Sequence, residues 1–120
     1  EASAENIGIN PDQVAKTLVF KAGEKFIAVI CPGDRRVSED KLEEYTGEEV
    51  RMAYTREVKE ETGYIVGGVS PFDLEIETVM EESLLEKEMI KPAAGSRVVG
   101  VEIDPEELKE VTGAVAEDLA

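Results

Sequence analysis

The residue best suited to chemistry is a lysine inside an apolar strand pattern. Lys16 interrupts the run at residues 14–20 (VAKTLVF), and the alternation of side chains along a strand places it on the same face as Leu18 and Phe20. If that face is buried, the ammonium group lies in or at the mouth of an apolar pocket, where it can attract an anion or a carbonyl oxygen. Alternatively, Lys16 extends into solvent from the start of the strand. The pattern leaves both interpretations open.

An uncharged segment at residues 64–72 (YIVGGVSPF) is the second candidate, in a chain of which 34% is charged. The paired glycines, Gly67 and Gly68, let another group approach the backbone closely and can leave N–H groups free to bind it. The same residues also fit a buried turn that binds no ligand.

Arg97 is the third candidate, because it follows a turn of small residues, Ala93 to Ser96, and opens a predicted strand. Its guanidinium group can bind a phosphate or a carboxylate through two parallel hydrogen bonds. The simpler alternative is a salt bridge to one of the many acidic residues.

Several catalytic classes are excluded by composition. The chain has no histidine and one cysteine, so it can form neither a zinc site of the usual kind nor a histidine-assisted serine or cysteine nucleophile. It contains no phosphate-binding loop, dinucleotide fingerprint or calcium-binding loop. We therefore predict no metal and no cofactor.

The 120 residues, 42% of them hydrophobic, predict a single globular domain spanning 1–120. The longest apolar run, 26–31, is too short to cross a membrane, so no membrane partner is expected. A lone cysteine and the lack of a signal segment favour the cytoplasm. We expect Cys31 to be a small buried side chain, with a reactive thiol as the alternative.

The net charge of −15 argues against a broadly basic nucleic-acid-binding face. Nine of the 13 basic residues lie in residues 1–60, so the two halves carry about −4 and −11. Contacts with an anion are therefore expected from the first half, together with Lys87, Lys91 and Arg97.

The pattern of apolar residues, caps and glycines predicts a mixed α/β (α+β) domain with helices outside a mixed sheet. Ser38, Thr55 and Asp104 are the predicted N-caps, and Gly47, Gly63 and Gly113 the helix ends. The predicted helices are 39–45, 56–62 and 105–112, with one helical turn at 82–85. The predicted strands are 14–21, 25–31, 49–53, 74–80, 86–90 and 97–103, and strand 74–80 is expected to have one solvent-exposed face. Residues 92–96 are predicted as a loop, and the tail 114–120 as a weak helix or a frayed end.

Four segments, taken in order and spacing, resemble the YbaK/EbsC family, the free-standing relatives of the prolyl-tRNA synthetase editing domain. They are VAKTL at 14–18, PGDRR at 32–36, TGYIVGGVSP at 62–71 and AGSR at 94–97. The resemblance covers nearly the whole chain. It implies a barrel-like mixed sheet surrounded by short helices, and hydrolysis of the ester of mischarged tRNA. The expected substrate is tRNA for proline that carries cysteine, alanine or another small amino acid.

The resemblance also implies roles for individual residues. The family's essential lysine falls on Lys16, and its Gly-x-x-x-Pro signature falls on Gly67 to Pro71. Catalysis is therefore assigned to Lys16 and Gly67. The remaining positions are expected to contact substrate: Thr17, Leu18, Gly68, Val69, Ser70, Pro71, Phe72, Ala94, Gly95, Ser96 and Arg97.

The implied partner is mischarged tRNA, through its 3′ terminal adenosine and aminoacyl group, with prolyl-tRNA synthetase as a second candidate partner and no role for DNA. Relatives usually begin with a further helix and strand, which we expect this chain to lack. The alternative function is a non-catalytic module of the same fold that binds tRNA or the synthetase. A weaker alternative is recognition of a free amino acid or nucleotide.

Overall fold

The computed structural model describes residues 14–63, 76–87, 89–94, 97–98 and 103–120, and within 91–94 and 97–98 it describes the backbone alone. The glycine segment at 64–72 lies outside the described residues. Gly95, Ser96 and most of the predicted strand 97–103 do so as well.

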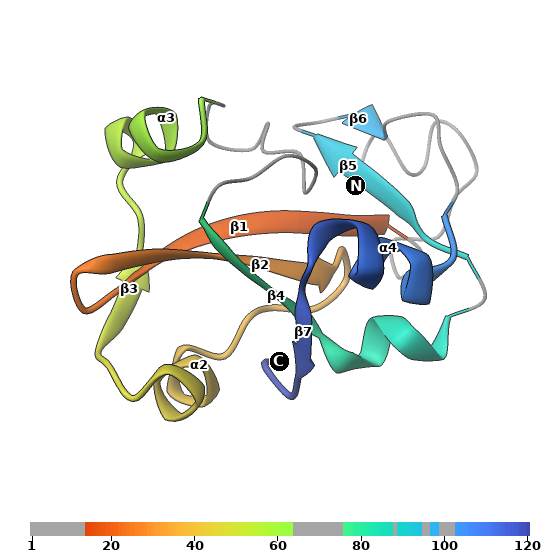
Figure 1. Ribbon diagram of the computed structural model, residues 1–120, viewed down its shortest axis with the longest axis horizontal. Helices are drawn as coiled ribbons and strands as arrows, with labels where there is room; N and C mark the ends of the chain where they lie inside the picture. Colours follow the sequence, from red (N-terminus) through yellow and green to blue (C-terminus); the bar gives the residue numbers. More distant parts are fainter. Residues whose placement is uncertain (1–13, 64–75, 88, 95–96, 99–102) are drawn as a thin grey trace.

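A long antiparallel hairpin forms the centre of the molecule (Figure 1). Strand β1 (Val14–Ala22) pairs with β2 (Lys25–Pro32) in a register that runs from Ala15 opposite Pro32 to Ala22 opposite Lys25. The turn contains Gly23 at φ 61°, a left-handed conformation that glycine adopts without steric cost. The predicted strands 14–21 and 25–31 are confirmed.

The sheet extends from this hairpin on both sides and is mixed, as predicted. Within the described residues its order is β6-β5-β1-β2-β4-β7, and β3 also pairs with β1. The added strands are β3 (Val50–Met52), β4 (Glu77–Glu81), β5 (Lys91–Ala94), β6 (Arg97–Val98) and β7 (Val115–Glu117). The pairs β1–β5, β2–β4 and β4–β7 are parallel, whereas β1–β3 and β5–β6 are antiparallel.

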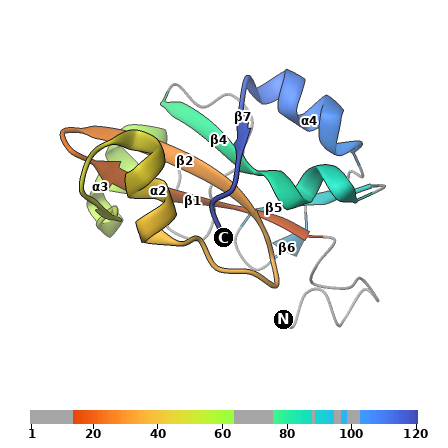
Figure 2. The ribbon, with the colours of Figure 1, turned by 90° about the horizontal axis from the view of Figure 1, so that it is seen from below.

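Short helices surround the sheet (Figures 1 and 2). Helices α2 (Glu39–Thr46) and α3 (Thr55–Thr62) lie on opposite sides of the hairpin near its turn. Helix α4 (Pro105–Thr112) and the 3₁₀ helix η2 (Glu82–Glu86) lie toward the other end. The predicted caps Ser38 and Asp104 are confirmed, because their side chains accept hydrogen bonds from the N–H groups of Lys41 and Glu106. The N-cap of α3 is Tyr54, one residue before the predicted N-cap, Thr55.

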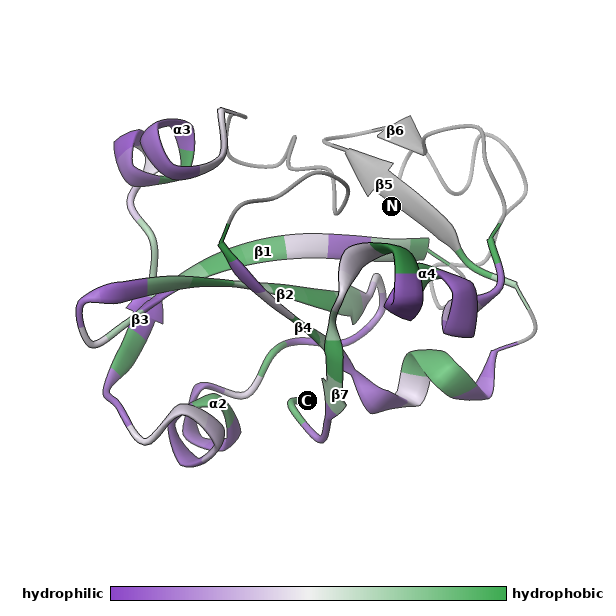
Figure 3. Ribbon diagram, viewed as in Figure 1, coloured by the Kyte–Doolittle hydropathy of each residue, from purple (hydrophilic) through white to green (hydrophobic). Residues whose placement is uncertain are grey.

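Apolar clusters cover both faces of the central strands, one cluster on one face and two on the other. The face that carries Phe20, Ile27, Val29 and Val79 packs against Leu42 of α2 and against Leu119. The opposite face packs against η2 and α4 at one end and against Val58 of α3 at the other; its main members are Ala15, Ile30, Met80, Leu84 and Leu108. Figure 3 shows the resulting pattern, with hydrophobic central strands and largely hydrophilic helices.

The prediction that strand 74–80 has one solvent-exposed face is wrong. The strand runs from Glu77 to Glu81, and Val79 and Met80 are both fully buried although they point to opposite faces. Glu81 is buried as well, with 1% of its surface exposed. The physical reason is position, because β4 lies between β2 and β7 and both of its faces are covered.

Two predictions near the end of the chain are also wrong. The described residues of the range 86–90, which are 86–87 and 89–90, belong to no strand: η2 ends at Glu86, and Ile90 makes an isolated bridge to Ile103. The next strand is β5, whose residues 91–94 overlap the predicted loop. The tail is neither helical nor frayed, because β7 pairs with β4 and Leu119 is fully buried.

Candidate active site

Lys16 lies near the start of β1, on the face predicted by alternation. In the antiparallel register it stands opposite Cys31, and the next pair on the same face is Leu18 with Val29. Leu18 packs against the apolar cluster of this face, whereas Lys16 is half-buried at the end of the same face. The lysine therefore lies at the margin of an apolar surface, between the two alternatives that the sequence left open.

A row of polar side chains crosses the sheet at the level of Lys16. Ile30 and Met80 are the last pair of the β2–β4 register, and Cys31 and Glu81 are the next residues of these two strands. The charges of Lys16 and Glu81 both act on the Cys31 thiol, and Glu81 pairs with Glu117 of β7. On this face of the sheet the side chains are therefore apolar as far as Leu18, Val29 and Val79, and polar at the next position on each strand. The sequence pattern did not identify this row, because it depends on the register of non-adjacent strands.

Cys31 is fully buried, as predicted, and its thiol donates a weak hydrogen bond to the carbonyl oxygen of Arg35 at 3.7 Å. Burial raises the pKa of the thiol to about 11, and the nearby Lys16 ammonium offsets part of that effect. The thiol is therefore protonated at neutral pH, so Cys31 is a neutral neighbour of the lysine and a poor nucleophile.

Glu81 is the charged centre of the row. Its carboxylate accepts hydrogen bonds from the N–H groups of Ser83 at 2.9 Å and Leu119 at 3.0 Å, and the Nη1 atom of Arg35 lies 3.5 Å away. Burial alone raises the pKa of this carboxyl, but the hydrogen bonds and Arg35 outweigh it and lower the pKa below its usual value. Glu81 therefore stays ionised and joins the loop after β2 to the C-terminal tail.

Thr17 points to the opposite face of β1 and is 6% exposed. Its hydroxyl has no hydrogen-bond partner among the described residues. A buried hydroxyl without a partner is uncommon, because losing water without compensation costs about 1–3 kcal/mol. Thr17 is thus a polar group next to Lys16 that is available for an additional contact.

The backbone of Ala93 and Ala94, the described part of the small-residue segment, belongs to a strand that pairs with the lysine strand. Strand β5 runs parallel to β1, with Lys91 beside Val14 and Pro92 beside Ala15, the residue before Lys16. Ala94 then pairs with Arg97 across the β5–β6 hairpin. The backbone therefore brings together two of the segments predicted to form the site.

Part of the predicted site is not described. Gly67, Gly68, Val69, Ser70, Pro71 and Phe72 lie outside the described residues, as do Gly95 and Ser96. Their contacts with Lys16 stay a prediction. Among the described segments, no group of three or more cysteine, aspartate or glutamate side chains is arranged to hold a metal ion. No helix in those segments is long and apolar enough to span a membrane.

The described residues also form two hollows at the far end of the hairpin, around Gly23. One, of about 470 Å³, is bordered by β1 and β3, and the other, of about 690 Å³, lies beside Tyr45 of α2. Neither includes Lys16 among its lining residues. They are therefore separate from the predicted ester site.

Comparison with known proteins connects this geometry to a family. The family model described as "Aminoacyl-tRNA editing domain" matches residues 1–113. The chain is 36% identical over 113 residues to the uncharacterized protein YwhH of Bacillus subtilis, in a match that covers 92% of this chain and 72% of YwhH. It is 32% identical over 117 residues to an Enterococcus faecalis protein named "Putative Cys-tRNA(Pro)/Cys-tRNA(Cys) deacylase EbsC", covering 93% of this chain and 71% of that protein.

A solved structure gives the same result for the fold. It is described as "a putative trans-editing enzyme for prolyl tRNA synthetase" and superposes with a TM-score of 0.88 at 29% identity, over 97% of this chain and 75% of that one. The mixed α+β class and the resemblance seen in the sequence are both confirmed. On the family match over residues 1–113, this chain belongs to the aminoacyl-tRNA editing domain family.

Proposed function

We propose that this chain is a free-standing deacylase that hydrolyses the ester between tRNA and a wrongly attached amino acid, in the cytoplasm. The observation that carries the proposal is the match of the editing-domain model over residues 1–113. The name of the EbsC relative and the description of the structural neighbour favour tRNA for proline as the substrate. The amino acid removed is cysteine, alanine or another small residue.

The chemistry needs little more than orientation and charge stabilisation. Water adds to the ester carbonyl carbon, the bond to the ribose oxygen breaks, and that oxygen leaves with a proton. An aminoacyl ester is already reactive, so stabilising the negative charge that develops on the carbonyl oxygen supplies much of the acceleration. Backbone N–H groups at Gly67 and Gly68 are assigned this task. For a cysteinyl ester, the substrate's own thiol is an alternative attacking group.

Lys16 is assigned to substrate binding, through the terminal phosphate, the ribose or the ester carbonyl. Its half-buried position at the margin of an apolar face supports this role, because an ammonium partly shielded from water attracts a negative oxygen more strongly than an exposed one. The protonated thiol of Cys31 opposite it does not compete as a nucleophile. Proton abstraction by Lys16 is the less favoured role.

Selection of the amino acid by size is assigned to the apolar walls of a small pocket that excludes proline. Leu18 is the described member of this set, and Val69 and Phe72 are the proposed others. The other proposed contacts are Thr17, whose side chain lies on the opposite face of β1 from Leu18, and the backbone of β5 and β6 beside β1. Ser70, Pro71, Ser96 and Arg97 complete the proposed set.

The decisive experiment measures deacylation of a panel of tRNAs charged with different amino acids. We expect Lys16→Ala to lower kcat/KM by about 100-fold or more on every substrate that the unchanged chain cleaves. Lys25→Ala is the matched control, because Lys25 lies exposed on the partner strand and should leave the rate unchanged. Full activity of Lys16→Ala would exclude the assigned role.

Gly67→Leu should block substrate binding, and normal turnover by that variant would remove the glycine segment from the site.

The second candidate is a binding module of the same fold that has no turnover. The net charge of −15 favours it, because a strongly acidic chain suits a basic protein partner better than free tRNA. Salt dependence separates the two, since direct tRNA binding weakens steeply as salt rises and apolar protein binding does not. A third option, capture of a free amino acid or nucleotide, predicts binding that does not require tRNA.

A further inference from the structure

An exposed aromatic ring flanked by two arginines lies between β3 and α3. Tyr54 is 55% exposed, and the guanidinium carbon of Arg51 lies 4.0 Å from the centre of its ring. The guanidinium carbon of Arg56 lies 6.0 Å from the same centre. Together with Lys21 of the adjacent strand, these residues are called the Tyr54 surface. A tyrosine this exposed contributes little to the core, so its ring is available to a partner.

Arg51 is fixed in place by Glu57. The two side chains form a two-pronged ion pair, with Nη1 2.9 Å from Oε1 and Nη2 3.0 Å from Oε2, and Glu57 also accepts the N–H of Tyr54 at 2.7 Å. The hydrogen bonds from Arg51 lead the effects that lower the pKa of Glu57 to about 2, with a smaller contribution from the charge of Lys21. Glu57 is therefore ionised and already paired, and it holds the stacked arginine against the ring.

Two cations of the Tyr54 surface keep their charge available. Neither Lys21 nor Arg56 forms an ion pair with any residue in the part of the chain that the structure describes. Lys21 is half-buried and its ammonium lies 5.8 Å from the ring centre of Phe26, while Arg56 is exposed. Proteins that bind single-stranded nucleic acids combine these two features: an aromatic ring on which a base stacks, and cations beside it that attract the phosphates.

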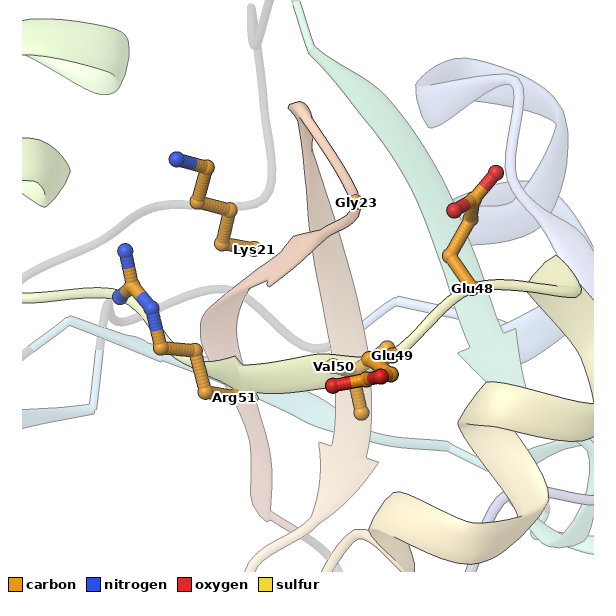
Figure 4. Close-up of a pocket in the computed structure, with 6 residues that line it drawn as sticks. All are labelled: Lys21, Gly23, Glu48, Glu49, Val50 and Arg51. Atoms are coloured by element: carbon orange, nitrogen blue, oxygen red, sulfur yellow. The ribbon is translucent and has the colours of Figure 1, made fainter.

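The hollow of about 470 Å³ next to this surface is polarised. Figure 4 shows the side chains of Lys21 and Arg51 extending to one side, and the carboxylate of Glu48 on the other side of the turn at Gly23. Glu49 also lines it. A phosphate is attracted to the first side and repelled from the second, so a bound strand would pass over the cationic side alone.

The Tyr54 surface is distinct from the ester site. Lys21 is five residues from Lys16 on β1, a separation of about 17 Å along an extended strand. Because the two positions differ by an odd number, their side chains point to opposite faces of β1. A ligand that reaches both must be a long polyanion that passes around the edge of the sheet.

We propose that the Tyr54 surface binds tRNA away from the aminoacyl ester, with an unpaired base stacked on Tyr54 and phosphates held by Lys21 and Arg56. The proposal rests on the proposed function, since it takes the substrate to be tRNA. It also accounts for binding of a polyanion by an acidic chain, because the contact uses local cations and not the net charge.

The test measures binding of an uncharged tRNA for proline by fluorescence anisotropy over a series of NaCl concentrations. The double variant Lys21→Ala/Arg56→Ala should lower the slope of log affinity against log salt by about 1.4, because each phosphate of a single strand that is no longer neutralised accounts for about 0.7. Tyr54→Ala should weaken binding about ten-fold, and Tyr54→Phe, which keeps the ring, should bind normally. Lys109→Ala on α4 is the control for removal of one positive charge and should leave the slope unchanged.

The proposal is overturned if the unchanged chain binds no tRNA, if the double variant keeps the original slope, or if Lys109→Ala lowers the slope as much per charge. Weaker affinity for prolyl-tRNA synthetase with normal tRNA binding would also overturn it, since the surface would then serve a protein partner. Thermal unfolding verifies each fold, and Lys21→Gln/Arg56→Gln replaces the alanine pair if that pair unfolds. Hydrolysis of a small aminoacyl-adenosine ester tests the deacylase separately, and the Tyr54 surface variants should hydrolyse it at the normal rate.

Discussion

At the scale of single residues, the environment of Lys16 is set by two buried neighbours with opposite properties. Cys31, directly opposite, is held neutral by burial, whereas Glu81, one strand further, is held ionised by hydrogen bonds and Arg35. Strand β1, which carries Lys16, therefore has a neutral thiol on the neighbouring strand β2 and a fixed negative charge on the next strand, β4. Both groups can be tested apart from catalysis.

The Cys31 thiol should react slowly in the folded chain. Its pKa of about 11 leaves little thiolate at pH 8, and the side chain is fully buried. We expect alkylation by iodoacetamide at pH 8 to be about 100-fold slower in the native protein than in urea. Mass spectrometry of the alkylated fraction measures both rates, and equal rates would show that the thiol is accessible and ionised.

Glu81→Gln should destabilise the fold by about 2 kcal/mol, because an amide cannot accept both N–H groups and leaves one buried and unpaired. The exposed neighbour Glu82 supplies the control, Glu82→Gln, which should change stability little. Urea unfolding at pH 7 measures both.

The pH dependence of this effect has a defined sign. The folded pKa of Glu81 is lower than the unfolded one, so the stabilisation is present above the unfolded pKa, about 4.3, and is lost as pH falls through the folded pKa. The difference between Glu81→Gln and the unchanged chain should therefore shrink below pH 4. A difference that grows with acid would contradict the assignment of an ionised Glu81.

At the scale of elements, the C-terminal tail is part of the core. Strand β7 pairs with β4, the carbonyl of Leu119 accepts the N–H of Ser38 at 2.7 Å, and Lys41 binds both Asp118 and the carbonyl of Ala120. The tail thus connects the start of α2 to the strand that carries Glu81. Stability of the lysine face depends on a segment far from it in sequence.

Leu119→Ala should lower the free energy of unfolding by about 2–5 kcal/mol, because it opens a cavity beneath α2 where the leucine is fully buried. Val111→Ala, on the exposed side of α4, is the matched control and should cost less than about 0.5 kcal/mol. Urea denaturation compares the two. Equal, small effects would mean that the tail contributes no packing.

At the scale of the whole molecule, charge acts on folding and on binding in opposite directions. The net charge of −15 produces repulsion within the folded chain, and added salt screens it. Contacts with tRNA phosphates, in contrast, weaken with salt because the release of counterions on binding becomes less favourable. Stability and affinity should therefore separate.

We expect the thermal midpoint to rise between 10 and 300 mM NaCl (about 30 and 5 Å of screening length) while tRNA affinity falls over the same range. Differential scanning fluorimetry and anisotropy measure the two quantities in one buffer series, and KCl is the control for ion-specific effects. If both quantities fell together, unfolding of the chain would explain the weaker binding, and the direct phosphate contacts would be excluded.

Local patterns were sufficient for the hairpin, the helix caps Ser38 and Asp104, and the face of β1 on which Lys16 lies. Alternation, capping and glycine turns act over a few residues, so they can be read from the chain alone. The resemblance located the family from four short segments, and the comparison over residues 1–113 confirmed it.

Tertiary structure decided the features that depend on distant partners. The burial of Glu81 requires β2 and β7 on either side of β4, the tail becomes a strand because β4 offers it an edge, and residues 91–94 extend because they pair with β1. The polar row through Lys16, Cys31 and Glu81 likewise exists only in the folded register. By itself, the sequence determined which residues could do chemistry and the face on which Lys16 stands, because those depend on local geometry. Which buried groups surround that lysine was decided by non-local pairing.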